Sequence, residues 1–429
     1  MNNSLVSVVM PVYNTGVLLK ESIGSLLNQT YTNIELLCVD DASNDTLTKE
    51  ILAEYLNADA RVKLIVLEKN IGAGGARNIG LEAAEGKYIL FFDSDDYAFP
   101  SMLEKLINQC EKNELDLCIC SAVVCDVESK GYITSIIHKE ERGTTDGYFS
   151  VKNLSEDALL HWNTAPWNKL FRLDFVKEIS CHFQEIASCN DVYFTIMCAM
   201  KATRIMYCEN GNPLVEYRKG RSNQISRNKK ISDLFLAFDK LFQDLKDVSN
   251  EEKNQLVTAL IYLSIAELMA SKDIQEKKKL YGFVSDFIRN QVRVEGIKSE
   301  KTKEICISFR DEKFESGWFE KNNNDEIDIH SVLKQLIDQN AIIIWGYGHN
   351  GVILDRKIHE MECSKKIYVT DKKDIMLGRK TQYESTIIET KSALEMDAAL
   401  IATNKEIYEY LSEILKDNTK KILIKGWIG

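Results

Sequence analysis

Three aspartates follow directly on a strongly apolar run, and their chemistry is the first clue to what this chain does. Residues 88–92 (YILFF) predict a buried strand that ends in Asp93, Asp95 and Asp96. Carboxylates this close repel one another unless a cation neutralises them. Oxygen ligands suit Mg²⁺ or Mn²⁺, and Mg²⁺ commonly binds one or two protein carboxylates together with substrate phosphates. A metal–diphosphate site is one interpretation, and a solvated acidic turn is the other, because Asp and Ser are also ordinary turn residues.

The elements that must position these acids alternate between strand and helix. Apolar runs at 6–12, 34–39, 62–67 and 88–92 predict four strands, and apolar residues at helical spacing lie between them. This alternation predicts a parallel, doubly wound α/β sheet. Ligands of such sheets bind beyond the carboxyl ends of the strands.

Polar residues stand at the ends of the strands, where a ligand is expected. Tyr13 and Asn14 follow the first strand, and Asp41 follows the second. The carboxylate of Asp41 is suited to accept a hydrogen bond from a nucleotide base, and the ring of Tyr13 is suited to border that base. Together with the acidic turn, these clusters favour a metal–nucleotide cleft over a solvated turn.

The stretch 70–78 (NIGAGGARN) predicts a glycine-rich loop that leads into a helix. Gly72, Gly74 and Gly75 permit close backbone approach to a ligand, and Arg77 supplies a charged donor to phosphate or ribose. The stretch fits neither a P-loop nor the dinucleotide fingerprint, so a flexible turn is the alternative.

Asp191 precedes an apolar run at 192–200 that predicts a helix. At such a position an aspartate is commonly an N-cap or a first-turn acid. That alternative stands beside any catalytic role.

Several blocks resemble the signature blocks of family 2 glycosyltransferases, which are inverting enzymes of the GT-A fold. The blocks are VSVVMPVYN at 6–14, LLNQTY at 26–31, VDDAS at 39–43, ARNIG at 76–80, DSDD at 93–96, WNKLFR at 167–172, ND at 190–191 and YR at 217–218. The resemblance covers roughly the first half of the chain.

The resemblance implies a role for each matched residue of the donor site. Asp41 would bind the base, usually uracil, within a wall that includes Pro11 and Tyr13. Gly72 and Arg77 would belong to the same nucleotide-sugar site.

The remaining roles concern the diphosphate and the acceptor. Asp93 would contact the ribose or the sugar, and Asp95 would coordinate Mn or Mg on the diphosphate. Ser94 would belong to the nucleotide-sugar site. Asp191 would be the general base that takes the proton from the acceptor hydroxyl.

The sequence departs from the family pattern at two positions. Asn190 stands where the family usually has Glu, which removes a like charge beside Asp191. Ala42 replaces the usual Gly of the Asp-Asp-Gly-Ser block.

Composition bounds the remaining possibilities. A length of 429 residues predicts two or three domains, which we place at 1–227 (GT-A domain), 228–335 (helical region) and 336–429 (small Rossmann-like domain).

A net charge of −11 argues against nucleic-acid binding. The first residues show no basic segment followed by an apolar core, and no apolar run reaches the length of a membrane span, so we expect a cytoplasmic protein without a signal peptide. The 11 cysteines form no Cys-x-x-Cys pair, so we expect reduced core thiols.

The C-terminal segment carries a second nucleotide-type signal. Gly346, Gly348 and Gly351 follow an apolar strand at 341–345, and Asp371 lies about 20 residues further on, as in the dinucleotide fingerprint. The segment also resembles small Rossmann-like domains attached to some bacterial polysaccharide-synthesis transferases. A nucleotide site and a structural or protein-interaction module both remain open.

We therefore expect an inverting glycosyltransferase that moves a sugar from a UDP-sugar to a glycan or lipid-linked acceptor in cell-surface polysaccharide synthesis. A nucleotidyltransferase is a second hypothesis, but residues 11–14 (PVYN) offer no basic triphosphate loop. A catalytically silent sugar-nucleotide-binding or scaffold protein is a third. Peripheral association with the inner membrane face and homo-oligomer formation are open.

Overall fold

The computed structural model describes residues 4–126, 132–136, 147–154, 159, 163–208, 213–219, 231–270 and 274–311, with shorter runs between 341 and 425. It divides into two compact units. The first comprises Met1–Cys120, His138–Glu209 and Asn223–Trp318, and the second comprises Ser121–Ile137, Asn210–Ser222 and Phe319–Gly429. The division into three domains at residues 227 and 335 stays a prediction.

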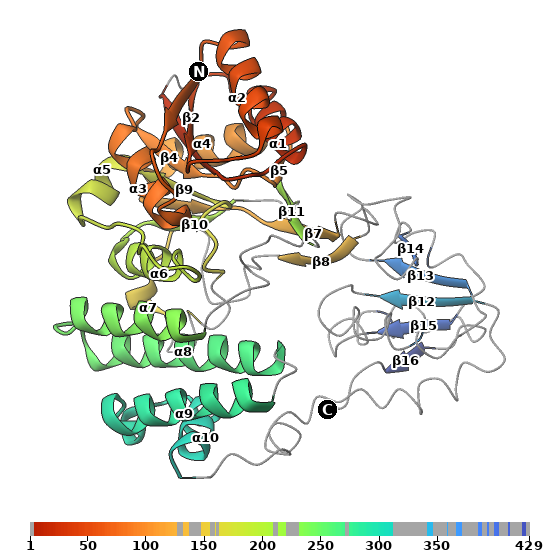
Figure 1. Cartoon of the computed structure of the whole chain (residues 1–429). Helices are drawn as coiled ribbons and strands as arrows, with labels where there is room; N and C mark the ends of the chain where they lie inside the picture. The colour runs from red at the N-terminus through yellow and green to blue at the C-terminus, as the bar shows by residue number, and fades with distance from the viewer. Residues whose placement is uncertain are drawn as a thin grey trace. The chain divides into compact units, whose positions relative to one another are not determined.

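The first unit is built on a seven-stranded sheet with the strand order β10-β6-β9-β4-β1-β2-β3 (Figure 1). Its strands are β1 (Val6–Val12), β2 (Ile34–Asp40), β3 (Val62–Val66), β4 (Tyr88–Phe91), β6 (Leu117–Ile119), β9 (Lys169–Arg172) and β10 (Ile205–Tyr207), while β5 (Tyr97–Ala98) lies outside this sheet. The four predicted strands, β1 to β4, are neighbours and run parallel. The sheet as a whole is mixed, because β9 runs antiparallel to β4 and to β6.

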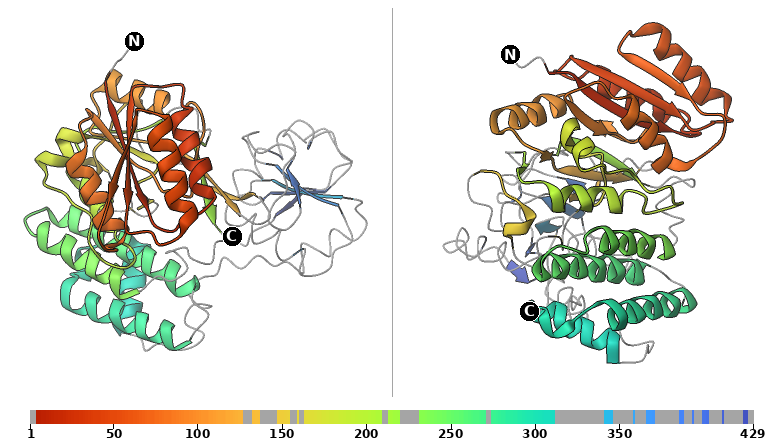
Figure 2. Two further views of the ribbon diagram at one scale, coloured as in Figure 1. Left: turned by 45° about the horizontal axis from the view of Figure 1, so that its top comes forward. Right: turned by 90° about the vertical axis from the view of Figure 1, so that its left-hand side faces the viewer.

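The strand order fixes where a ligand can bind. The connections through α1 (Leu18–Leu27) and α2 (Thr46–Ala58) step in one direction, from β1 to β2 and from β2 to β3. The connection through α3 (Gly72–Ala83) returns from β3 across β2 and β1 to β4. Right-handed crossovers therefore put α1 and α2 on one face and α3 on the other, as Figure 2 shows. The order reverses between β1 and β4, and that switch point is where doubly wound sheets bind their ligands.

Among the residues that the structure describes, six α-helices between residues 18 and 201 accompany the sheet. They are α1 (Leu18–Leu27), α2 (Thr46–Ala58), α3 (Gly72–Ala83), α4 (Met102–Asn113), α5 (Leu173–Glu178) and α6 (Val192–Lys201).

The glycine-rich stretch is helical, which corrects the loop predicted from sequence. Helix α3 begins at Gly72, whose φ is +84°, so Gly74, Gly75 and Gly80 are helical residues. A Cβ at Gly80 would overlap Cγ1 of the buried Val9, and a Cβ at Gly74 would overlap the backbone oxygen of Gln184. These glycines let α3 approach its neighbours closely.

Four phenylalanines form the part of the core that lies beneath the acidic turn. The rings of Phe183 and Phe194 stack at 4.0 Å between centroids, and Phe91 meets Phe183 edge-on at 4.7 Å. Phe171 meets Phe194 edge-on at 5.4 Å. Aromatic pairs of this geometry stabilise beyond their buried area. They fix the end of β4, the segment around residue 183 and the start of α6 in one arrangement.

A helical array follows α6 within the first unit. Its helices are α7 (Ile231–Asp244), α8 (Asn250–Ala270), α9 (Ile274–Gln291) and α10 (Glu300–Asp311). Helix α7 packs on α6, and each later helix packs on the one before it (Figure 2). Among the described residues, no helix is both long enough and apolar enough to cross a bilayer.

The second unit contains strands from two parts of the chain. The strands β7 (Ala122–Asp126), β8 (Tyr132–Ile136) and β11 (Val215–Lys219) pair with one another. The C-terminal strands are β12 (Ala341–Trp345), β13 (Lys366–Thr370), β14 (Thr386–Ile387), β15 (Ala399–Ala402) and β16 (Leu423–Lys425).

The C-terminal strands form a parallel sheet ordered β14-β13-β12-β15-β16. Counted along the chain this order is 3-2-1-4-5, as in doubly wound sheets. Gly346, Gly348, Gly351 and Asp371 lie outside the described residues. Their nucleotide site and the Rossmann-like assignment stay predictions.

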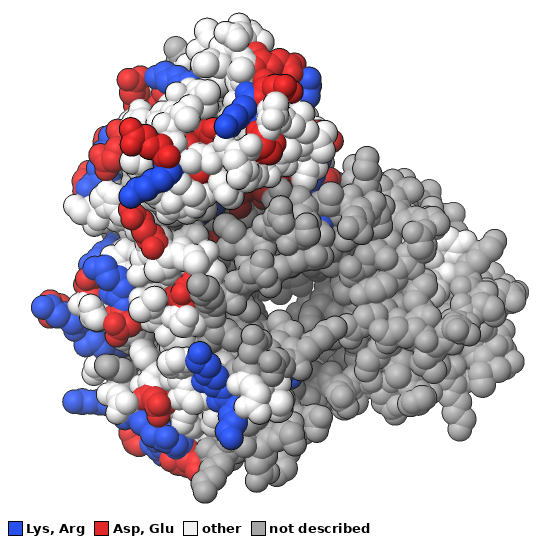
Figure 3. All heavy atoms as spheres, viewed as in Figure 1, with Lys and Arg blue, Asp and Glu red and all other residues white. Residues whose placement is uncertain are grey.

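Acidic and basic side chains are interspersed on the described surface, as Figure 3 shows for one face. Lys20 pairs with Glu54 at 2.9 Å, and Lys298 pairs with Glu251 at 2.8 Å. Exposed pairs of this kind contribute little to stability, and where acids and bases alternate in this way the surface has no uniform basic field.

Close packing of α3 predicts a contrast between two helical glycines. Gly80→Ala should lower the free energy of unfolding by about 1–3 kcal/mol, because the new methyl group overlaps Val9. Gly282→Ala in α9 is the matched control, since nothing lies within 4 Å of its added Cβ. Urea denaturation should show that the control is neutral or more stable by up to about 1 kcal/mol. Equal effects at the two positions would contradict the packing argument.

Candidate active site

The loops that follow β1 and β2 are tied to each other by hydrogen bonds. The side-chain oxygen of Asn14 accepts from the backbone N–H groups of Asn44 (2.9 Å) and Asp45 (3.1 Å). In return, the hydroxyl of Ser43 accepts from the backbone N–H of Asn14 at 3.0 Å. The two strand ends therefore form one rigid edge beside the switch point.

Asp41 lies at this edge and caps helix α3. Its two carboxylate oxygens accept from the backbone N–H groups of Ile71 (2.7 Å) and Gly72 (2.9 Å). Burial raises the pKa of the Asp41 carboxyl, and the two amide donors oppose that rise. A carboxylate has further lone pairs, so this bonding leaves the predicted contact with a base available.

The other predicted base-site residues differ in exposure. Pro11 is buried within β1, whereas Tyr13, just beyond the strand, is 48% exposed. Ala42, which stands where the family usually has Gly, has φ of +58°. That left-handed conformation favours glycine and explains why glycine is common there.

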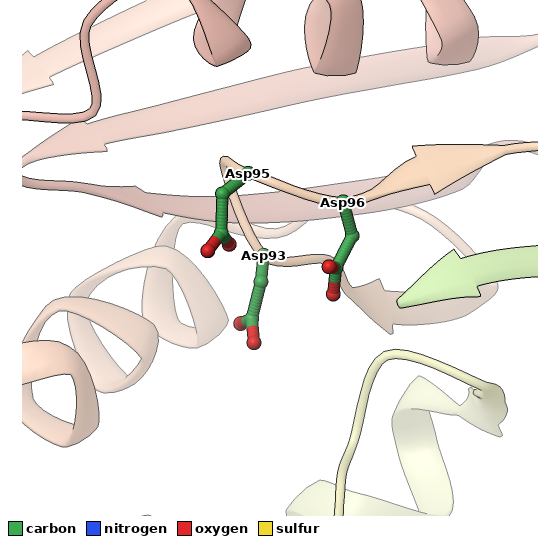
Figure 4. Close-up of side chains that lie close together, drawn as sticks. All are labelled: Asp93, Asp95 and Asp96. Carbon is green, nitrogen blue, oxygen red and sulfur yellow. The ribbon is translucent and has the colours of Figure 1, made fainter. Parts of the chain in front are cut away.

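The acidic turn after β4 gathers three carboxylates. One oxygen each of Asp93, Asp95 and Asp96 lies within 4.8 Å of the others, and the three side chains leave the turn on the same side (Figure 4). Asp95 and Asp96 are buried, while Asp93 is partly exposed. Oxygen atoms in this arrangement suit a hard divalent cation.

The hydroxyl groups of Thr15 and Ser22 hold the acidic turn in place through hydrogen bonds. Ser94 shares a 2.7 Å hydrogen bond with Thr15, in the loop after β1. Ser22 of α1 donates to the backbone oxygen of Asp93 at 3.1 Å. Because the hydroxyl of Ser94 is buried in this contact, it fixes the turn, and its predicted contact with a sugar nucleotide stays a prediction.

Arg77 connects the acidic turn to the start of α6. Its guanidinium donates to Oδ1 of Asp93 at 2.7 Å and to Oδ1 of Asn190 at 2.8 Å. It lies 5.3 Å from the centre of the Phe183 ring and is only 6% exposed. Its Nε has no hydrogen-bond acceptor among the described residues. The structure thus brings Asp93 and Asn190, almost one hundred residues apart in the chain, to a single side chain.

Asp191 stands at the N-cap position of α6, but its side chain makes no capping hydrogen bond. The carboxylate is half-buried. Its backbone oxygen accepts from the N–H and the hydroxyl of Thr195, both at 3.0 Å. The side chain is therefore not used as an ordinary helix cap.

The segment before Asp191 is anchored to α3. Asn78 donates to the backbone oxygen of Phe183 at 2.9 Å and accepts from the N–H of Phe183 at 2.8 Å. The backbone oxygen of Gln184 packs against Gly74. Helix α3 therefore holds both the acidic turn, through Arg77, and the approach to Asp191.

Lys169 is a completely buried lysine in β9. Its Nζ donates to the backbone oxygens of Asn163 (2.6 Å) and Ala165 (2.7 Å) and to Oδ1 of Asn168 (2.9 Å). Burial lowers the pKa of Lys169 to about 7, and the negative charge of Asp191 opposes that change. Three acceptors match the three N–H groups of an ammonium ion, so the geometry favours the charged form.

The family model for glycosyl transferase family 2 matches residues 7–180. The glycosyltransferase GlyG of Streptococcus pneumoniae serotype 4 is 30% identical over 261 residues, which is 55% of this chain and 82% of GlyG. The chain belongs to glycosyltransferase family 2. A second relative of this glycosyltransferase is the UDP-Glc:alpha-D-GlcNAc-diphosphoundecaprenol beta-1,3-glucosyltransferase WfgD of Escherichia coli. It is 44% identical over 115 residues, 27% of this chain and 44% of WfgD.

Solved structures resemble the glycosyltransferase in fold. S. aureus TarS 1-349 in complex with UDP-GlcNAc superposes with a TM-score of 0.57 at 22% identity, over 71% of this chain and 87% of TarS 1-349. At this identity the likeness shows the GT-A fold alone. The predicted fold class is confirmed.

Sequence reasoning missed the partners of the glycosyltransferase's predicted residues. Asn190 was noted as a departure, but nothing in the sequence linked it to Arg77. The signal that could have marked Lys169 as buried is its place beside Leu170 and Phe171 in the block WNKLFR, because a lysine buried among apolar residues must find hydrogen-bond acceptors.

The buried guanidinium predicts a difference between two arginines. Arg77→Lys should lower the free energy of unfolding by about 1–3 kcal/mol, because an ammonium does not reproduce the planar fork that reaches Asp93 and Asn190. Arg61→Lys is the control, since Arg61 pairs with Asp59 nearer the surface and should change stability by less than about 1 kcal/mol. Denaturation curves for the two variants that coincide would refute the bridging role.

Proposed function

We propose that this glycosyltransferase is a metal-dependent, inverting enzyme that moves a sugar from a nucleotide-diphospho-sugar to a hydroxyl of an acceptor. Asp191 is the general base, and the acidic turn at Asp93–Asp96 holds a divalent cation. The observation that carries the proposal is the Arg77 bridge between Asp93 and Asn190, because it joins the acidic turn to the residue beside Asp191.

The proposed donor is a UDP-sugar. The name of WfgD specifies a UDP-Glc donor, and TarS has been solved with UDP-GlcNAc, which support this choice. The base site consists of Pro11, Tyr13 and Asp41 at the ends of β1 and β2. The exposed ring of Tyr13 is suited to cover a base, and Asp41 to accept from its N–H.

The residues of the acidic turn fit a divalent cation, Mn or Mg. Three carboxylate oxygens within 4.8 Å repel one another, and a cation between them removes that repulsion. Asp95 is the ligand we assign first, with Asp93 toward the ribose or sugar. When bound, such a cation neutralises charge on the leaving diphosphate.

The proton of the acceptor hydroxyl is transferred to a side chain of this protein, Asp191. The acceptor oxygen attacks the anomeric carbon while the nucleoside diphosphate leaves from the opposite face, so one displacement inverts the configuration. Asp191 takes the proton from that oxygen, a contribution of roughly 10²–10⁴ in rate. Arg77 and Asn190 hold the neighbouring backbone, so the carboxylate stays directed at the acceptor.

The proposed setting is the cytoplasmic side of the membrane, in the assembly of a cell-surface polysaccharide. The name of WfgD describes a lipid-diphosphate-linked acceptor, which supports a glycan or lipid-linked acceptor for this chain too. Peripheral attachment to the membrane face and self-association belong to the same proposal.

Two variants separate the proposed base from the proposed metal ligand. Asp191→Asn should lower the release of UDP from a UDP-sugar in the presence of Mn²⁺ by roughly 10²–10⁴-fold. It should still bind UDP in a calorimetric titration with Mn²⁺. Asp95→Asn should instead weaken that Mn²⁺-dependent binding, because it removes a ligand charge.

Asp286→Asn is the control, because Asp286 lies on α9 with 75% of its side chain exposed and carries the same charge. It should behave as wild type in both assays. Full turnover by Asp191→Asn would refute the base assignment, and unchanged Mn²⁺-dependent binding by Asp95→Asn would refute the metal assignment.

A further inference from the structure

A buried aspartate on helix α7 binds the segment that leads to Asp191. Oδ2 of Asp233 accepts two hydrogen bonds from Ser188, one from its backbone N–H at 2.9 Å and one from its hydroxyl at 3.0 Å. Both residues are almost completely buried. Ser188 lies only three positions before Asp191, so this contact acts on the backbone that carries the proposed base.

The same segment adopts a conformation that its surroundings must impose. Cys189, between Ser188 and Asn190, has φ of +53°, a left-handed conformation that costs a non-glycine residue about 1–3 kcal/mol. The N–H of Gln184 donates to the backbone oxygen of Asn190 at 3.3 Å, which closes residues 184–190 into a loop. A loop strained in this way persists only when several contacts hold it.

Helix α7 is well placed to hold this loop from outside the sheet. Asp233 lies in its first turn, where the helix dipole favours a negative charge. The helix is fixed by its buried face, which includes Leu234, Phe238 and Leu241 in the same core cluster as α6. The loop is therefore held from two sides, by Arg77 of α3 at Asn190 and by Asp233 of α7 at Ser188.

We propose that Asp233 is a positioning residue for Asp191, and that helix α7 belongs to the catalytic apparatus although it follows the matched residues 7–180. Asp233 does not touch substrate. It keeps Cys189 in its left-handed conformation, and that conformation directs Asp191 toward the acceptor. This inference rests on the proposed function of Asp191 as the general base.

The proposal predicts loss of turnover without loss of donor binding. The donor site is built on the ends of β1, β2 and β4, which Asp233 does not contact in the described hydrogen bonds. Displacement of a catalytic group by about 1 Å can lower the rate by about 10²-fold. Asp233→Ala should therefore lower kcat by roughly 10- to 100-fold and leave the KM for the UDP-sugar within about twofold.

Cys189 provides a direct report on the loop, because it is a partly exposed thiol inside it. We would measure its alkylation by iodoacetamide with mass spectrometry, in the full chain and in variants. Asp233→Ala should accelerate the alkylation of Cys189 at least about tenfold, since the loop opens more often. Asp233→Asn should restore most of the protection, because both bonds from Ser188 go to one oxygen that an amide also offers.

Asp244→Ala is the matched control on the same helix. Asp244 accepts a 2.6 Å hydrogen bond from Tyr193 of α6 and pairs with Lys240, but it lies about three turns from Asp233. It should leave Cys189 protected and kcat within about twofold of wild type. If Asp233→Ala fails to fold, Ser188→Ala removes the hydroxyl donor alone and should show the same two effects at smaller size.

The outcomes distinguish a failure of the positioning role of Asp233 from a failure of the proposed function of Asp191. Turnover is measured as UDP release from UDP-glucose or UDP-GlcNAc with Mn²⁺. Unchanged Cys189 alkylation in Asp233→Ala, or equal acceleration in Asp244→Ala, overturns the positioning role whatever the enzyme catalyses. Faster alkylation with full kcat shows a structural contact alone and also overturns it. Full kcat in Asp191→Asn would instead overturn the proposed base.

Discussion

The candidate site depends on one buried guanidinium. Arg77 carries a charge into a region where it is 6% exposed, so it needs partners of good geometry, and it finds them in Asp93 and Asn190. Those partners come from the acidic turn and from the loop before α6. The ring of Phe183 beneath the guanidinium joins the same aromatic cluster that fixes β4 and α6. One side chain thus joins the acidic turn to the loop before α6.

The position of this site follows from the topology of the sheet. Strand order reverses between β1 and β4, and the carboxyl ends there carry Tyr13 and the acidic turn. Hydrogen bonds between Asn14 and the loop after β2, and between Thr15 and Ser94, tie the loops at these strand ends together. The close contact of Gly80 with Val9 brings α3, and with it Arg77, against β1. The helical array also holds the loop before Asp191, because Asp233 of α7 accepts two hydrogen bonds from Ser188 in that loop.

The sequence predicted the strands and acids because both follow local rules. Apolar periodicity marked β1 to β4, and strand-end acids marked Asp41 and the acidic turn. It did not predict the antiparallel β9, a four-residue strand that begins with Lys169 and ends with Arg172. The prediction of a loop at 70–78 was wrong, because glycine is typical both of turns and of helices that pack closely on their neighbours. The links of Arg77 to Asn190, and of Asp233 to Ser188, depend on tertiary contacts that no local pattern encodes.

The central claim is that the acidic turn and the start of α6 form a single sugar-nucleotide site. A crystal structure with UDP and Mn²⁺, with the metal located by its anomalous signal, tests this most directly. The account predicts a manganese peak within about 2.5 Å of a carboxylate oxygen of Asp95, with the diphosphate on the same side of the turn as Arg77. A manganese ion or diphosphate bound away from Asp93–Asp96 would contradict it.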